Sequence, residues 1–315
     1  FLKFVLGLVL LVKGTDLPII AIVSHQRLRE EPPCDGNCEF MPFSYVKWVE
    51  MAGGRAVRMP YNASTAEVDF ILTQVNGLLL IGGDVEVTEG ISYALERIVE
   101  MNEKGDFFPV WGTCLGFEWL TQIFSNNASI VEDNYDAENI NFPIIYEPGI
   151  EQSRLFSGVP FEIRNKTENA SVAFHAHSKG TKPEAFRSDE NLNNLFKILA
   201  TNYDRNGKPF VSAMEAHYLP IFAVMWHPEK ANFEFGLEES GVPHQIINHS
   251  YLAKTFSFYL AQFFVKNASK SRHRFKSVEI ESERLFYGLK TWRSYEPTYV
   301  ESLIFEIEEN GGQVS

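Results

Sequence analysis

Hydrophobic residues between positions 17 and 125 occur as short continuous runs separated by longer amphipathic stretches. Runs that are apolar throughout predict strands buried on both faces; they are expected at 17–23, 55–61, 77–83 and 107–112. The stretches between them have apolar residues at helical spacing and predict helices at 44–54, 66–75, 91–105 and 115–124. Buried strands that alternate with helices indicate a three-layer α/β fold, with helices on both faces of a mostly parallel sheet.

The second half of the chain has a less regular pattern. Residues 126–180 contain short apolar groups between loop residues, and we expect strands and loops added to the core sheet. Residues 210–230 predict a β-hairpin, and residues 246–266 predict one long helix. The chain then becomes basic and later mixed, so residues 271–315 are expected to form a C-terminal extension packed on the surface of a single domain over 15–270.

The first 14 residues have a different character. One lysine precedes an apolar run that is too short to span a bilayer, which takes roughly 20 residues. A basic residue followed by such a run resembles the hydrophobic part of a signal peptide, and residues 1–14 are predicted to be part of one. The alternative is a first core strand, a place that residues 17–23 fill better.

Six Asn-x-Ser/Thr sequons favour a glycosylated protein of a lumen or of the extracellular space. They begin at Asn62, Asn127, Asn165, Asn169, Asn248 and Asn267. Cys34 and Cys38 lie close together in a polar loop, where a small disulfide, two free thiols or half of a metal site are the alternatives. Cys114 is then the odd cysteine, which marks it for attention.

Composition excludes some partners. With 315 residues and 45% hydrophobic content the chain is long enough to bury a large core. A formal net charge of −13 argues against nucleic acid or an anionic membrane surface as the main partner. No stretch after the first 14 residues is apolar enough to predict a membrane span.

Cys114 lies in "VWGTCLGFE", between Gly112 and Gly116, at the end of a predicted strand. A buried packing role is one interpretation. The other is a nucleophile on a sharp strand-to-helix turn, which flanking glycines permit. At that position the N-terminus of the helix favours negative charge, and the Leu115 N–H is a candidate oxyanion donor. Gly82 and Gly83, at the end of the preceding strand, are the candidates for a second donor.

A thiol nucleophile needs a base, and the base needs a group that orients it. The string "MWHPE" supplies both, because His227 ends an apolar strand and Glu229 follows two positions later. A surface His-Pro turn is the alternative. Carboxyl ends of parallel strands meet at one edge of a sheet, so Cys114 and His227 are expected to lie close together.

Together "VWGTCLGFE" and "WHPEK" resemble the class I glutamine amidotransferase-like superfamily and, more closely, the gamma-glutamyl hydrolase family. The similarity extends through "PIIAI", "SYVKWVEMAG", "GLLLIGG" and "FHAHS" and covers most of residues 17–270. It implies a Cys114–His227–Glu229 catalytic arrangement, with His175 as a substrate-side histidine. The implied activity is hydrolysis of folylpoly-gamma-glutamates through a thioester, without a cofactor, in the lysosome or in secretions. Relatives also imply a homodimer.

Polyglutamate substrates are anionic, so the site needs local cations. Lys230 follows the "HPE" string directly, and Arg154 and Lys179 are further candidates. Glu118 lies four residues after Cys114, so on a helix it shares the nucleophile's face and is taken as a site residue. Its charge would repel the substrate and raise the pKa of the cysteine.

Three alternatives concern metal and function. His175 and His177 could form a zinc pair, although no further ligand cluster accompanies them and no metal is expected. A glutaminase that passes ammonia to a synthetase and a non-catalytic glycoprotein with this fold are the competing functions. We also expect Cys114 and His227 to form a thiolate–imidazolium ion pair, because the cysteine precedes a helix and has a histidine partner.

Overall fold

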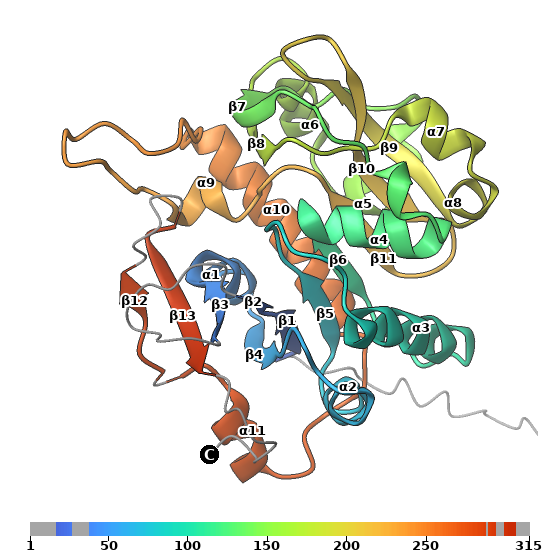
Figure 1. Ribbon diagram of the computed structural model, residues 1–315, viewed down its shortest axis with the longest axis vertical. Helices are drawn as coiled ribbons and strands as arrows, with labels where there is room; N and C mark the ends of the chain where they lie inside the picture. The colour runs from blue at the N-terminus through green and yellow to red at the C-terminus, as the bar shows by residue number, and fades with distance from the viewer. Residues whose placement is uncertain (1–16, 27–37, 288, 294–298, 307–315) are drawn as a thin grey trace, which may run out of the picture.

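The computed structural model describes residues 17–26, 38–287, 289–293 and 299–306. A seven-stranded sheet runs through the molecule in the order β4-β1-β5-β6-β11-β10-β9 (Figure 1). Its strands are β1 Ile19–Val23, β4 Arg55–Met59, β5 Gly77–Leu80, β6 Val110–Thr113, β9 Phe196–Tyr203, β10 Pro209–Ala216 and β11 Ile221–Val224. The four strands expected in the first half are therefore confirmed, as is the hairpin of β10 and β11.

The five strands from β4 to β11 in this order are parallel, and β10 alone is reversed, because it pairs antiparallel with both of its neighbours, β11 and β9. Leu79 of β5 lies opposite Trp111 of β6, which in turn lies opposite Phe222 of β11. Every residue of β1, β5, β6 and β11 is buried, as expected for strands covered on both faces. The mostly parallel sheet is confirmed.

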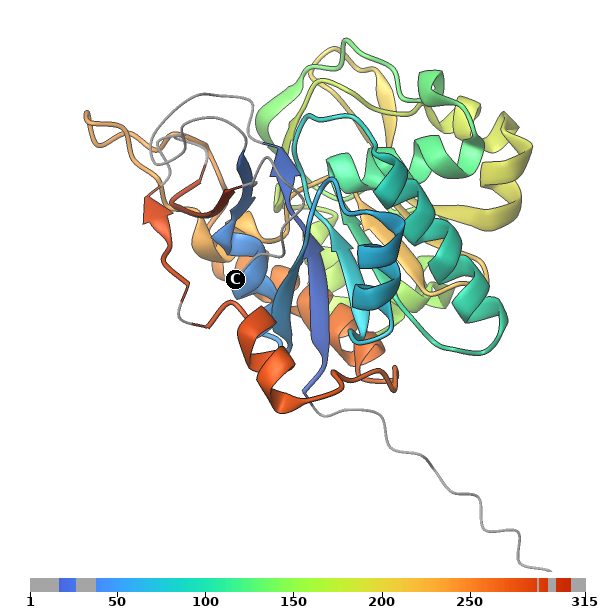
Figure 2. The same ribbon diagram turned by 60° about the horizontal axis from the view of Figure 1, so that its bottom comes forward.

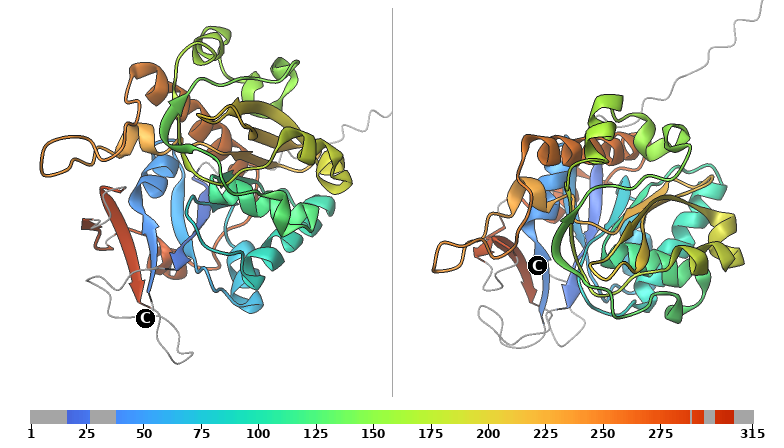
Figure 3. Two further views of the ribbon diagram at one scale, coloured as in Figure 1. Left: turned by 45° about the horizontal axis from the view of Figure 1, so that its top comes forward. Right: turned by 90° about the horizontal axis from the view of Figure 1, so that it is seen from above.

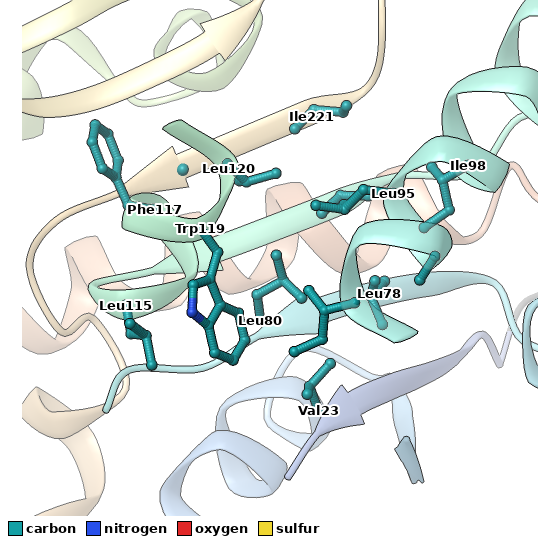
Figure 4. Close-up of a cluster of buried hydrophobic side chains, with 14 of the residues drawn as sticks. Val23, Leu78, Leu80, Leu95, Ile98, Leu115, Phe117, Trp119, Leu120 and Ile221 are labelled. Atoms are coloured by element: carbon teal, nitrogen blue, oxygen red, sulfur yellow. The ribbon is translucent and has the colours of Figure 1, made fainter. Parts of the chain in front are cut away.

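Helices cover the sheet on both faces and make two hydrophobic clusters. One face packs against α2 Thr65–Leu72, α3 Glu89–Glu103 and α4 Leu115–Ser125 (Figures 2 and 4). In that cluster Leu78 and Leu80 of β5 meet Trp119 and Leu120 of α4. The other face packs against α1 Phe43–Glu50 and α10 Tyr251–Ala268. Two cores on one sheet give the three-layer α/β fold that the sequence predicts.

The segment after α4 departs from the expectation. It forms β7 Ala137–Phe142 and β8 Ala173–His177, which pair only with each other and make a separate two-stranded sheet. The prediction that residues 126–180 add strands to the core sheet is therefore wrong. The free edge of β10 is instead occupied by β9, whose residues form the longest antiparallel register in the sheet. Short helices α5 Arg154–Ser157, α6 Phe161–Thr167, α7 Pro183–Ser188 and α8 Glu190–Leu195 complete this region.

The C-terminal segment pairs with the beginning of the chain. β13 Glu301–Glu306 lies antiparallel to β3 Cys38–Pro42 in a four-stranded sheet of order β12-β13-β3-β2 (Figure 3). The other two strands are β2 His25–Gln26 and β12 Trp292–Arg293. Leu303 is buried in the α1 side of the core, and α11 Val278–Arg284 precedes the buried Leu285 and Phe286. The division at residue 270 stays a prediction.

Two predictions about the N-terminal part concern residues that the structure does not describe. The predicted signal-peptide residues 1–14 and Cys34 are not among the described residues. Cys38 is disulfide-bonded and Cys114 is a free cysteine, but the pairing of Cys34 with Cys38 stays a prediction. Within the part of the chain that is described, no helix has both the length and the hydrophobicity of a membrane span.

Candidate active site

Cys114 sits on a sharp turn between β6 and α4, and its backbone has φ 51° and ψ −105°. This is an unusual conformation for a residue with a side chain, and such residues cluster at functional sites. A Cβ added to Gly116 would overlap the Leu80 carbonyl oxygen, and one added to Gly112 would lie 2.8 Å from the Gly116 oxygen. The two glycines thus allow α4 to pack directly on β5 and β6, which leaves Cys114 at the carboxyl edge of the sheet.

His227 and Glu229 follow β11, the strand next to β6. His227 Nδ1 lies 2.8 Å from Glu229 Oε1, and both side chains are buried. A carboxylate accepts this hydrogen bond, so Nδ1 carries the proton and Nε2 is the nitrogen left to accept one. The backbone N–H of His227 donates to the Phe174 carbonyl at 2.8 Å, which ties the histidine to β8.

Cys114 and His227 meet over Gly82, which follows β5. A Cβ placed on Gly82 would lie 2.5 Å from His227 Cε1 and 3.2 Å from Cys114 Cβ. Both side chains therefore border the same small volume, although they come from opposite halves of the chain. This arrangement is the one that a thiol nucleophile and its base require.

A tyrosine that no sequence motif marks completes this group. The Tyr45 hydroxyl accepts a hydrogen bond from the Gly82 N–H at 2.8 Å and lies 3.4 Å from His227 Nδ1. The Gly82 N–H, expected as an oxyanion donor, is thus already engaged. The Leu115 N–H faces the Cys114 sulfur, where it lowers the pKa of the thiol, and Gly83 packs against His25. Tyr45 comes from an ordinary amphipathic helix, so no sequence signal marked it.

Burial and nearby carboxyl groups affect the charge state of Cys114. Burial raises the pKa of the thiol well above its usual range, and the carboxyl groups of Glu118 and Glu229 raise it further. With the side chain only 3% exposed, these effects outweigh the helix N-terminus and the Leu115 N–H. The raised pKa favours a neutral thiol in this conformation, and the expected thiolate–imidazolium pair stays a prediction.

Glu118 does not carry the charge that would repel an anionic substrate. Burial raises the pKa of its carboxyl group to about 8, while Lys179 lowers it and Asp84 and Asp133 raise it. Below that pH the side chain is protonated, so it can donate a hydrogen bond beside Cys114. Burial, which sequence spacing does not reveal, removes the difficulty that an ionised Glu118 would create.

The Glu118→Gln variant is expected to change how stability depends on pH. The folded-state pKa of Glu118 lies above its usual value of 4.5, so folding binds a proton and stability falls as pH rises from about 4.5 to about 8. Glutamine lacks this titration, so the variant should gain on the order of 5 kcal/mol relative to wild type above pH 8. Urea unfolding at pH 5 and pH 8.5 measures the difference, and an equal gain at both values would contradict the assignment.

The three candidate cations occupy different places. Lys230 is buried, donates to Gln245 Oε1 at 2.7 Å and lies 4.4 Å from the centre of the Tyr299 ring. Burial lowers the pKa of Lys230, and the Cys114 and Glu229 side chains are near enough to oppose this shift. Lys179 pairs with Asp84 at 2.6 Å, and both residues are close enough to shift the pKa of Glu118.

Arg154 lies elsewhere. It donates to the carbonyl oxygens of Ala216 and Leu219, and its guanidinium covers the Phe222 ring. These contacts tie α5 to the β10–β11 turn. Arg154 is therefore not part of the candidate site.

His175 and His177 lie on the same side of β8, and both are buried. His175 Nδ1 and His177 Nε2 are 2.9 Å apart. Among the described residues no group of three or more histidine, cysteine or acidic side chains is arranged to hold a metal ion.

The family model described as "Glutamine amidotransferase class-I" matches residues 48–238, which include Cys114 and His227. The fold and the site thus define a class I glutamine amidotransferase-like protein. Three curated relatives are a gamma-glutamyl hydrolase of Mus musculus, gamma-glutamyl hydrolase B of Dictyostelium discoideum and gamma-glutamyl hydrolase 1 of Arabidopsis thaliana. The Mus musculus protein is 36% identical over 87% of this chain and 84% of its own length. The Dictyostelium discoideum protein is 32% identical over 86% of this chain and 78% of its own length. The Arabidopsis thaliana protein is 31% identical over 90% of this chain and 78% of its own length. This chain belongs to the gamma-glutamyl hydrolase family.

Proposed function

We propose that this protein is a cysteine-dependent hydrolase that cleaves the γ-glutamyl amide bonds of folylpoly-gamma-glutamates. Membership of the gamma-glutamyl hydrolase family supports the substrate class. The observation that carries the proposal is the meeting of Cys114 and His227 over Gly82. Hydrogen bonding of His227 to Glu229 supports the role of the histidine as the base.

The neutral thiol determines how the reaction starts. His227 Nε2 takes the Cys114 proton as the sulfur attacks the γ-carbonyl carbon, so the carbon–sulfur bond forms and the carbonyl π electrons move to oxygen. The Leu115 and Gly83 N–H groups are the proposed donors to that oxyanion. As the tetrahedral intermediate collapses, the carbon–nitrogen bond breaks and His227 gives its proton to the departing amine.

Hydrolysis of the thioester uses the same groups. His227 takes a proton from water, the hydroxide oxygen attacks the thioester carbon, and the carbon–sulfur bond breaks as the thiol recovers a proton from His227. Glu229 keeps the Nδ1 proton in place through both halves. Lys230 is the proposed partner of a substrate carboxylate, and protonated Glu118 is the proposed donor to another substrate oxygen.

Products from a defined folate pentaglutamate test this proposal. Shorter γ-glutamyl chains in the mass spectrum would support it. Ammonia released from free glutamine without chain shortening would instead indicate a glutaminase. No product from either substrate would contradict both and leave a non-catalytic glycoprotein.

The six sequons support a lumenal or secreted protein, with the lysosome and the extracellular space as the proposed locations. Four of the asparagines are exposed, namely Asn62, Asn127, Asn165 and Asn169, and Asn248 is half-buried. Asn267 is buried in α10, where it donates to the Phe263 carbonyl at 2.9 Å and accepts from Lys270 Nζ at 2.7 Å. The homodimer implied by the resemblance stays a prediction.

We expect glycans on the exposed sequons and none on Asn267 in the folded, secreted protein. A glycan on Asn267 Nδ2 would need space around a nitrogen that is buried and donates to the Phe263 carbonyl, so the folded side chain cannot carry one. Expression in a glycosylating host, followed by gel mobility of Asn62→Gln and Asn267→Gln variants, measures this. A mobility shift in Asn267→Gln as large as in Asn62→Gln would contradict it.

A further inference from the structure

Two hydrogen-bonded histidines on β8 lie beside the candidate active site; the resemblance implies that His175 faces the substrate, whereas His177 has no assigned role. His175 Nδ1 lies 2.9 Å from His177 Nε2, and His177 Nδ1 lies 2.7 Å from the Lys179 carbonyl oxygen. The strand touches the catalytic group, because the Phe174 carbonyl accepts the backbone N–H of His227. The backbone of β8 next to His175 is therefore tied to the proposed base, His227.

The order of the contacts determines where each proton lies. A carbonyl oxygen only accepts, so His177 Nδ1 is the donor to Lys179. A neutral imidazole has one N–H, so His177 Nε2 bears a lone pair and His175 Nδ1 donates to it. Burial keeps both rings neutral, because it lowers the pKa of His177 to about 4 and that of His175 well below its usual range. His175 Nε2 is then left with a lone pair and no proton.

That lone pair has no partner among the described residues. His175 Nε2 is a buried atom without a hydrogen bond, and the rings of Phe142, Phe210 and Trp226 hold the imidazole in place. A buried acceptor without a hydrogen bond destabilises the folded protein, so this atom calls for an explanation. A ligand that brings the missing donor supplies one.

We propose that His177 is a positioning residue that holds His175 in the Nδ1–H tautomer, so that His175 Nε2 accepts a hydrogen bond from an N–H group of the γ-glutamyl substrate. Every γ-glutamyl link carries such an N–H. The opposite tautomer would place N–H against N–H and would repel the substrate. The substrate part of this inference rests on the proposed function, whereas the tautomer is a property of the free protein.

Nitrogen NMR of ¹⁵N-histidine-labelled protein tests the tautomer without any substrate. The His175 signals are assigned as those missing from a His175→Asn variant. In the wild type we expect a protonated Nδ1 and an unprotonated Nε2. His177→Leu removes the acceptor, so the Nδ1–H population of His175 should fall. His177→Gln offers an amide oxygen at a similar place and should retain it. A protonated Nε2 in the wild type, or the same spectrum for both variants, would overturn the proposal.

Kinetics on a γ-glutamyl peptide test the role in binding. His177→Leu is expected to lower kcat/KM about 10-fold, the cost of one lost hydrogen bond, and His177→Gln about 3-fold or less. Thermal unfolding of both variants separates this effect from loss of fold. If His177→Leu and His177→Gln lost the same factor in kcat/KM while being equally stable, the role of His177 in binding would be overturned. If the wild type hydrolyses nothing, the proposed function fails, and the NMR result still decides the tautomer.

Discussion

The Cys114→Ala variant is expected to lose hydrolysis of γ-glutamyl substrates by on the order of 10⁴-fold or more, because no other group in the site can form the thioester. Of the residues that the structure describes, Cys114 is the free cysteine. The fold should be unaffected, since the change removes one buried sulfur and leaves the backbone turn in place. Product formation at saturating substrate and a urea titration measure the two properties.

Cys114→Ser is the matched variant for this experiment. A hydroxyl has nearly the same size, but His227 must remove a proton from a much weaker acid. We expect Cys114→Ser to be almost as inactive as Cys114→Ala, and thermally as stable as wild type. Substantial activity in the alanine variant would show that another residue is the nucleophile, and the proposed mechanism would have to be abandoned.

The Gly82→Ala variant is expected to have the second-largest effect, a loss of kcat of about 10²- to 10³-fold, the cost of misplacing a catalytic group. The added methyl group would come within 2.5 Å of His227 Cε1 and 2.9 Å of the Tyr45 hydroxyl. Both groups are ends of side chains, so they can shift and the fold should survive. The shift separates the base from Cys114, whereas affinity for the substrate should change less than kcat.

Gly158→Ala is the control for Gly82→Ala. Gly158 ends α5 with a negative φ, and a Cβ there meets nothing within 4 Å. This variant should keep full activity and stability. If Gly82→Ala also kept full activity, Cys114 and His227 would not act together over Gly82, and the central geometric argument would fail. Loss of fold in Gly82→Ala would be seen in its unfolding curve before any kinetic conclusion is drawn.

The elements predictable from the sequence are those whose signal is local. Continuous apolar runs identified the parallel strands, because burial on both faces leaves no polar position in them. The sharp turn at Cys114 was predictable because the close approach of α4 to β5 and β6 needs glycine at positions 112 and 116. His227 and Glu229 were predictable because both lie within one short turn after a strand.

The features that could not be predicted depend on contacts between segments that are far apart in the sequence. Tyr45 belongs to the site because α1 brings its hydroxyl to Gly82, and an amphipathic helix pattern does not say which aromatic residue does so. The raised pKa values of Cys114 and Glu118 follow from burial by residues far along the chain. β7 and β8 were assigned to the wrong sheet because strand patterns do not specify which edge a strand pairs with.

The pairing of β13 with β3 has a consequence for shortened forms of the protein. β3 precedes α1, the helix that carries Tyr45, and its residues from Cys38 to Pro42 are all paired with β13. A chain cleaved before Glu301 would leave a row of bare backbone donors and acceptors on β3, a ready template for another strand. Proteolytic trimming of the C-terminal segment should therefore produce self-association and precipitation, even though every catalytic side chain would still be present.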